Sequence, residues 1–217
     1  MCIRDRNISK LIAEKVSSEL NYDNERKEII QYGTYALIQT LISIISVLIL
    51  GLVFNIALEA LIFLFTASIL RKYSGGAHSE SSNVCTLLGI IISICIGFLI
   101  KSSFFAKMNF ELVVFIGIVI FVFGYFIVFK FAPVDTKNKP IKTEKKKKRM
   151  KKGSLKILTI YLFIEVLSII LYYNSGWSLA KPVMLSIIFG VAWQCMTLTY
   201  IGNILLKTID SFTNKLL

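Results

Sequence analysis

Residues Phe110–Phe131 read FELVVFIGIVIFVFGYFIVFKF, and the two charged residues of this segment, Glu111 and Lys130, lie close to its ends. A helix over the segment would be about 33 Å long, which is enough to cross a hydrocarbon core of about 30 Å. A helix that is apolar on every side is typical of a membrane span or of the core of a large protein. Since the chain has only 217 residues, the segment predicts a membrane-spanning helix.

Short charged connectors separate this segment from five further apolar ones: Thr34–Phe54, Ala57–Leu70, Cys85–Ile100, Leu155–Tyr173 and Val183–Leu206. In the whole chain 55% of the residues are hydrophobic and the mean hydropathy is +0.70. A soluble domain of this length cannot bury so much apolar surface. The sequence therefore predicts an all-α polytopic membrane protein with six transmembrane helices. The second and third segments in chain order are short for a span, so the polar stretch between them is expected to lie partly in the membrane.

The chain before the first span predicts a separate N-terminal element. Within Asn7–Leu20 the apolar residues recur at helical spacing, which indicates an amphipathic helix at the membrane surface. Asp23 or Asn24 is expected to cap the helix that follows. The predicted organisation is a cytoplasmic amphipathic helix in residues 1–33 and a six-helix transmembrane domain in residues 34–217, with a candidate active-site loop at 71–85 and a basic cytoplasmic loop at 132–154.

The basic residues predict how the chain is oriented in the membrane. With both termini in the cytoplasm, about 22 of the 25 Lys and Arg residues fall in cytoplasmic segments, as the positive-inside rule requires. In Lys145–Lys152 every position except Met150 is basic. This basic run is expected to contact anionic lipid head groups, an acidic peptide segment, or both. No aromatic residue is interleaved with its lysines, which argues against nucleic acid as a partner.

The four cysteines, Cys2, Cys85, Cys95 and Cys195, predict neither a disulfide framework nor a metal site. They form no CxxC pair, and a zinc site needs several nitrogen or sulfur ligands close together, whereas the chain has one histidine. Cys95 and Cys195 lie inside apolar segments and are expected to pack as small apolar side chains. The sequence predicts no metal and no cofactor.

Residues 71–85 read RKYSGGAHSESSNVC and hold the single histidine, His78, seven residues before Cys85. On one continuous helix these two side chains would stand about 10 Å apart along the axis. Gly75, Gly76 and the polar run after His78 instead predict a turn, which would fold His78 back onto Cys85.

Ser82 or Asn83 is expected to cap the next helix and so to place Cys85 in its first turn. There the helix dipole and the free N–H groups would favour the thiolate, and the same N–H groups would stabilise an oxyanion. A nearby imidazole would act as a base and later protonate a leaving amine. The spacing alone leaves a second interpretation open, namely a loop histidine and a packed thiol without chemistry.

Two motifs carry a resemblance to a known family. They are Arg71-x3-Gly75-Gly76-x-His78-x6-Cys85 and the segment PVDTKNKPI at 133–141, which the basic run follows. In this order, and with this topology, they resemble the hallmarks of the accessory gene regulator B (AgrB) family of membrane cysteine peptidases. The resemblance covers essentially the whole chain after Arg6.

The resemblance implies a cysteine endopeptidase of a Gram-positive cell membrane that acts on an AgrD-like quorum-sensing propeptide. Cys85 would be the nucleophile and His78 the base. After cleavage, a cysteine of the peptide would displace Cys85 to give a thiolactone, and a serine would give a lactone. The resemblance also implies a homodimer and places Arg71 in the active-site architecture, with Gly75 and Gly76 as turn formers. The candidates to orient His78 are Glu80, Asn83 and Asp135.

Two other functions remain open from the residues alone. A small transporter for the peptide or another solute would tolerate Cys85→Ala, whereas a peptidase would lose cleavage and ring formation. A membrane scaffold that binds acidic partners would survive loss of His78 and Cys85 but fail when Lys145–Lys152 is neutralised. Glu165 and Gln194 lie inside apolar segments, where polar residues are either functional or hydrogen-bonded to another helix.

Overall fold

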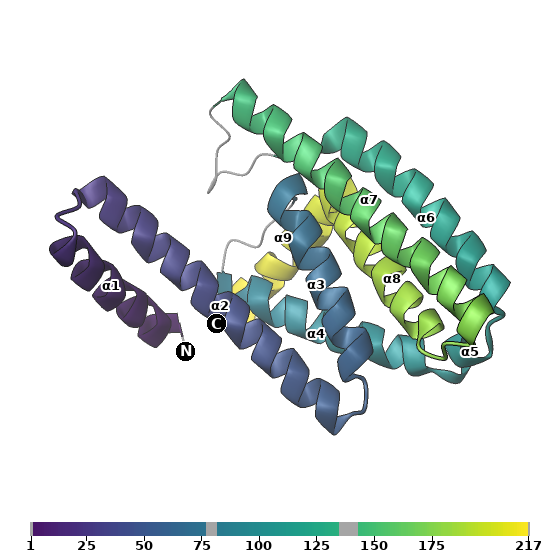
Figure 1. The fold of residues 1–217 in the computed structure, drawn as a ribbon. Helices are drawn as coiled ribbons and strands as arrows, with labels where there is room; N and C mark the ends of the chain where they lie inside the picture. Colours follow the sequence, from purple (N-terminus) through teal and green to yellow (C-terminus); the bar gives the residue numbers. More distant parts are fainter. Residues whose placement is uncertain (1, 77–81, 135–142, 217) are drawn as a thin grey trace. The chain divides into compact units, whose positions relative to one another are not determined.

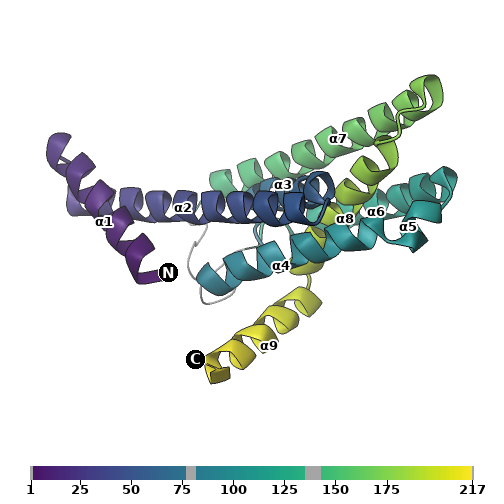
Figure 2. The same cartoon turned by 90° about the horizontal axis from the view of Figure 1, so that it is seen from below.

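The computed structural model describes residues 2–76, 82–134 and 143–216, and their regular structure is helical throughout (Figure 1 and Figure 2). The helices are α1 (Cys2–Glu19), α2 (Asn24–Val53), α3 (Ala57–Ser74), α4 (Ser82–Lys101), α5 (Ser103–Lys107), α6 (Phe110–Phe131), α7 (Glu144–Ser175), α8 (Ala180–Leu198) and α9 (Tyr200–Leu216). Within these residues α2, α4, α6, α7 and α8 are long and apolar enough to cross a membrane. The prediction of an all-α polytopic membrane protein is confirmed.

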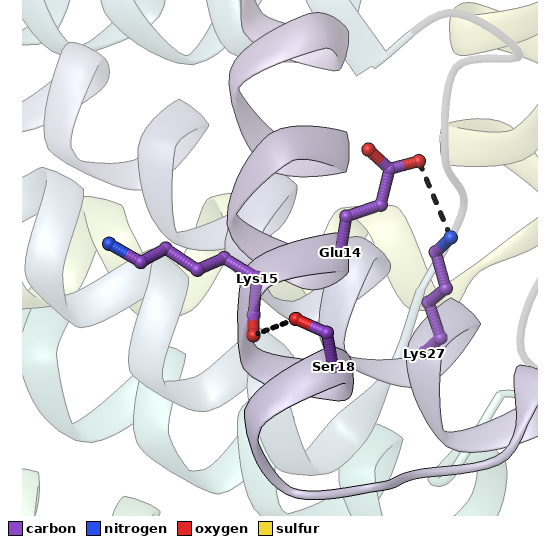
Figure 3. Close-up of polar contacts among 4 residues, drawn as sticks. All are labelled: Glu14, Lys15, Ser18 and Lys27. Atoms are coloured by element: carbon purple, nitrogen blue, oxygen red, sulfur yellow. Dashed lines mark hydrogen bonds and ion pairs between the residues drawn. The ribbon is translucent and has the colours of Figure 1, made fainter.

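The first of two compact units is Met1–Ser46, which contains α1 and the N-terminal part of α2. Asp23 caps α2 as expected, because its Oδ1 accepts the N–H of Arg26 at 3.1 Å. An ion pair of 3.3 Å between Glu14 and Lys27 joins α1 to the start of α2 (Figure 3). Both side chains are partly exposed, so this pair contributes little to stability.

α1 carries exposed apolar side chains, with Ile8, Leu11 and Ile12 exposed by 40%, 65% and 41%. These three side chains share one side of the helix, since they are three and four residues apart. Contiguous exposed apolar surface commonly marks contact with a membrane or a partner. The placement of this helix at the membrane surface stays a prediction.

The second unit, Val47–Leu217, is built around α8. In the most apolar 18-residue stretch of α8, 61% of the residues are buried within the chain. The corresponding share is at most 33% in each of the other four candidate spans. α8 contacts α3, α4, α6, α7 and α9, and Figure 1 shows α6 and α7 running side by side next to it. A residue on α8 can therefore reach several other elements of this unit.

Two clusters of buried side chains hold this unit together, and α8 contributes to both. One cluster joins the C-terminal half of α8 to α3, α6 and α7, and includes Val191, Leu70 and Leu158. The other joins its N-terminal half to α4 and α6, and includes Met184 and Val113. The outer side of α6 keeps large apolar side chains exposed, as a surface in contact with lipid would.

α3 and α4 are longer than the short apolar segments that predicted them. They span 18 and 20 residues, or about 27 and 30 Å, because polar residues at their facing ends continue the helices. Residues 71–74 and 82–85 of the expected loop are therefore helical. The lengths of α3 and α4 do not support the expectation that the stretch between them lies partly in the membrane. α7 likewise begins at Glu144, so residues 144–154 of the expected basic loop are helical.

The last apolar segment, Val183–Leu206, does not form one helix. α8 ends at Leu198, Thr199 is extended with φ −90° and ψ 166°, and α9 begins at Tyr200. A Cβ added to Gly202 would overlap the last turn of α8, so glycine permits the close approach of the two helices. Hydropathy did not reveal this break because apolar residues continue through it.

The crossing of α3 and α8 depends on Gly190. A Cβ added there would lie 2.7 Å from Cβ of Thr66, so Gly190→Ala is expected to destabilise the protein by about 1–3 kcal/mol. Gly89→Ala is the matched control, since Gly89 also lies in a helix and has no atom within 4 Å of an added Cβ. Thermal unfolding in detergent measures both variants, and equal midpoints would contradict close packing at this crossing.

Candidate active site

The first motif begins at the end of α3. α3 ends at Ser74, and the N–H of Gly75 donates to the carbonyl of Arg71 at 2.9 Å to close the last turn. Gly75 and Gly76 have φ values of +70° and +130°, a region that residues with a Cβ rarely adopt. The two glycines are therefore required by the backbone itself. The Arg71 side chain is half-buried at this end of the helix.

The second motif meets the first at this turn. The N–H of Val134 donates to the carbonyl of Ser74 at 2.9 Å, and Val134 forms an isolated parallel bridge with Gly75. A Cβ on Gly75 would overlap the Val134 carbonyl oxygen, so the two backbones pass as closely as glycine allows. Segments that the sequence predicted only as separate motifs are thus in contact.

α8 supports the same turn through Gln194, which is fully buried. Its amide Nε2 donates to Ser74 Oγ at 2.9 Å and to the Gly75 carbonyl at 2.7 Å. A Cβ on Gly76 would lie 2.9 Å from Thr197 Oγ1. Gln194 was conspicuous in the sequence as a polar residue in an apolar segment, and it does bond to another helix. Nothing in the sequence singled out Ser74 or Thr197.

Cys85 lies in the first turn of α4, as predicted. The expected caps, Ser82 and Asn83, lie inside the helix, because α4 already begins at Ser82. Cys85 and Asn83 are half-buried, and Cys85 is not in a disulfide. α3 and α4 contact one another, so the turn at Gly75 and the thiol belong to neighbouring helices.

Several predicted residues lie outside the described parts of the chain. His78 and Glu80 fall in 77–81, and Asp135 falls in 135–142. The pairing of His78 with Cys85, and the residue that orients the imidazole, therefore stay predictions. The structure brings Ser74–Gly76, Val134 and Gln194 together around the start of the segment that contains His78.

The other polar and sulfur-containing residues of the spans differ in their surroundings. Glu165 on α7 is 4% exposed, and its carboxyl oxygens have no hydrogen-bond partner among the described residues.

Cys195 is packed as expected in the cluster around the C-terminal half of α8. Cys95 is exposed in this chain, because it lies on an outer side of α4, and the prediction that it is packed is wrong. Across the described ranges no three His, Cys, Asp or Glu residues are grouped to hold a metal ion.

The basic run forms the first turns of α7 and borders a cavity of about 390 Å³. The lining combines four lysines with Glu144 and the end of α6, namely Lys130, Phe131, Ala132, Pro133, Glu144, Lys147, Lys148 and Lys151. Pro133 directly precedes Val134, so this basic cavity adjoins the segment that pairs with Gly75. Its charge suits an anionic group.

These features define an all-α multi-pass membrane protein with a thiol in the first turn of α4 and a turn of two glycines at the end of α3, which contacts α4. The family model for accessory gene regulator B matches residues 9–198. A putative AgrB-like protein of Clostridium perfringens is 93% identical over 211 residues, which cover 97% of this chain and 99% of that protein. The chain belongs to the accessory gene regulator B family.

More distant relatives agree with this assignment. The accessory gene regulator protein B of Staphylococcus intermedius is 30% identical over 155 residues, which cover 71% of this chain and 72% of that protein. The protein of the same description from Staphylococcus epidermidis is 26% identical over 201 residues, covering 91% and 92%. No solved structure matches the chain significantly. Membership of the family gives the protein a role in agr quorum sensing.

Proposed function

We propose that the chain is a membrane cysteine endopeptidase that cleaves an AgrD-like propeptide and promotes its cyclisation. The observation that carries the proposal is the position of Cys85, in the first turn of α4, a helix that contacts α3, whose end leads through the glycine turn to the segment with His78. A thiol at a helix start is a suitable nucleophile, because the free N–H groups favour negative charge there.

In the first step His78 takes the proton of Cys85, and the sulfur attacks a backbone carbonyl carbon of the propeptide. A C–S bond forms, and the C–N bond to the C-terminal part breaks. The proton held by His78 passes to the leaving amine, and a thioester to Cys85 remains. In this proposal, N–H groups at the start of α4 stabilise the oxyanion of this step.

In the second step a cysteine thiol of the bound peptide attacks the thioester carbonyl. Its proton goes to His78, a new C–S bond closes the ring, and the thiolate of Cys85 is released. A serine of the peptide would give a lactone by the same route. Exchange of one thioester for another changes the free energy little, so exclusion of water from the intermediate decides between ring closure and hydrolysis.

The proposal assigns roles to the remaining residues of the two motifs. Arg71 and Asp135 contribute to the site architecture and to substrate contacts, and Gly75 with Gly76 forms the turn. Glu80, Asn83 and Asp135 are the candidates to orient His78. The basic helix start in 144–152 contacts anionic lipid head groups or the peptide. The proposed protein is a homodimer in a Gram-positive cell membrane, with both termini in the cytoplasm.

The test needs no substrate, because it measures how fast iodoacetamide alkylates Cys85 in liposomes. At about pH 6.5 a free thiol, with a pKa of about 8.5, is almost fully protonated and reacts slowly. We expect Cys85 to react about tenfold faster in the native chain than in His78→Ala, because the imidazole favours the thiolate. Comparing one thiol in two proteins removes differences in access, and equal slow rates would contradict the proposal.

A transporter is the second candidate function, and the buried carboxylate of Glu165 favours it. Ionisable groups inside a span commonly mark ion or proton pathways. The two functions separate on one pair of variants: transport would be lost in Glu165→Ala and kept in Cys85→Ala, whereas cleavage would be lost in Cys85→Ala.

A further inference from the structure

The amide of Gln194 makes two hydrogen bonds to a segment 119 and 120 residues earlier in the chain. Both acceptors, Ser74 Oγ and the Gly75 carbonyl, belong to the turn after α3, and both hydrogens of the amide are thereby used. The side chain has no solvent exposure. Water therefore does not compete for these bonds, and the orientation of the amide is set by them.

The bonds fix the turn from two sides. Ser74 Oγ also donates to the carbonyl of Leu70 at 2.9 Å, so Gln194 extends a chain of hydrogen bonds that begins in the last turn of α3. On the other side, the N–H of Val134 donates to the Ser74 carbonyl. Carbonyl groups at a helix end lack partners within the helix and need them from elsewhere. Here α8 and the Pro133–Val134 segment supply contacts that hold the turn.

The surroundings of Gln194 are apolar. The neighbouring Val191, Cys195 and Leu198 belong to the buried cluster around the C-terminal half of α8. An apolar side chain of the same length would fill this position but would leave the Gly75 carbonyl without the Gln194 donor. Gln194 Oε1 is itself buried with no hydrogen-bond partner among the described residues. The position is therefore better explained by what the amide holds than by packing.

We propose that Gln194 is a positioning residue of the peptidase site, which holds the Ser74–Gly75–Gly76 turn and thereby sets where the chain enters the segment that carries His78. This inference rests on the proposed function. His78 lies two residues after Gly76, so a shift of the turn alters where its backbone starts. Gln194 acts through Ser74 and Gly75 and takes no part in the chemical steps.

The test uses Gln194→Met in the full-length chain in liposomes. Methionine has nearly the same length and suits an apolar site, but it removes the donor of two hydrogen bonds, so the midpoint of thermal unfolding is expected to fall only slightly. The alkylation rate of Cys85 by iodoacetamide at about pH 6.5 is expected to fall. The loss is expected to be about threefold, the equivalent of an average hydrogen bond between helices in a membrane, and no greater than the loss of about tenfold expected for His78→Ala. A loss of Cys85 reactivity with only a small loss of stability is the result that a purely structural role does not give.

Two serines provide a matched control. Ser74 and Ser186 are both fully buried, and each donates to the carbonyl four residues earlier, but only Ser74 also accepts from Gln194. Ser74→Ala is expected to lower the Cys85 rate, and Ser186→Ala to leave it unchanged. In Gln194→Met, adding Ser74→Ala is expected to have little further effect, because the bond is already lost.

The outcomes separate the inference from the function on which it rests. If the Cys85 rate is the same in Gln194→Met as in the native chain, or falls equally in Ser186→Ala, the positioning role is wrong. If the rate in the native chain does not depend on His78, the proposed function itself fails, whatever Gln194→Met shows. A loss of rate in Gln194→Met and Ser74→Ala, with only a small change in unfolding temperature and no loss of rate in Ser186→Ala, supports the inference.

Discussion

Cys85→Ala is expected to abolish propeptide cleavage and ring formation together, with a loss of rate of about 10⁴-fold or more. The reason is that both steps pass through the same sulfur, which forms the thioester and is then displaced from it. Mass spectrometry of the peptide, incubated with the protein in liposomes, measures both products in one experiment. Cyclic product, released C-terminal fragment and linear peptide all differ in mass.

Cys95→Ala is the matched control, since it removes a free thiol from the same helix, α4. It is expected to leave both products unchanged, because Cys95 lies about 15 Å along α4 from Cys85. Cleavage that persists in Cys85→Ala would falsify the peptidase proposal and favour the transporter. Cleavage without cyclisation in the native protein would instead show that the thioester is open to water.

Gly75→Ala is expected to have the second largest effect. Its φ of +70° and ψ of −145° lie in a region that is essentially restricted to glycine, at a cost of about 1–3 kcal/mol for other residues. In addition, the new Cβ would overlap the carbonyl oxygen of Val134. The chain must then separate the two motifs or unfold locally, so we expect cleavage to be lost and thermal stability to fall.

Gly176→Ala separates the cost of the left-handed backbone from the cost of the overlap with Val134. Gly176 has a φ of +63° at the end of α7, but no atom lies within 4 Å of an added Cβ. Its cost is that of the left-handed backbone alone, about 1–2 kcal/mol, with cleavage kept. If Gly75→Ala behaves like Gly176→Ala in both unfolding and cleavage assays, the close contact with Val134 has no functional weight.

The sequence by itself determined that the chain has several apolar helices able to span a membrane, and Phe110–Phe131 has the same bounds in the prediction and in α6. It predicted six spans, whereas five helices of the described residues are long and apolar enough, and α3 is not among them. The apolar helices are predictable because transfer into a bilayer depends on the apolar character of each residue and needs no knowledge of its neighbours. The start of α2 was predictable for a similar reason, since the Asp23 cap acts over three residues. Cys85 and His78 were predicted as candidate catalytic residues from their residue types and spacing.

Helix ends were less predictable where tertiary contacts set them. The polar residues Arg71–Ser74 and Ser82–Val84 continue α3 and α4 beyond the apolar segments, although hydropathy indicated a loop. The break at Thr199 is likewise set by the packing of α9 against α8 near Gly202. Apolar character reports which residues can be buried, but not where the backbone turns.

Only the tertiary structure decided which segments meet at the candidate site. Val134 pairs with Gly75, and Gln194 bonds to the same turn from α8. Gln194 was visible in the sequence as an anomaly, but its acceptors were not. A hydrogen bond between distant segments depends on how helices pack, and the same sequence is compatible with many other pairings of donors and acceptors. The candidate residues for chemistry could therefore be recognised from their own stretch of sequence. The contacts around the glycine turn arise instead from the packing of α3, α8 and the segment after α6.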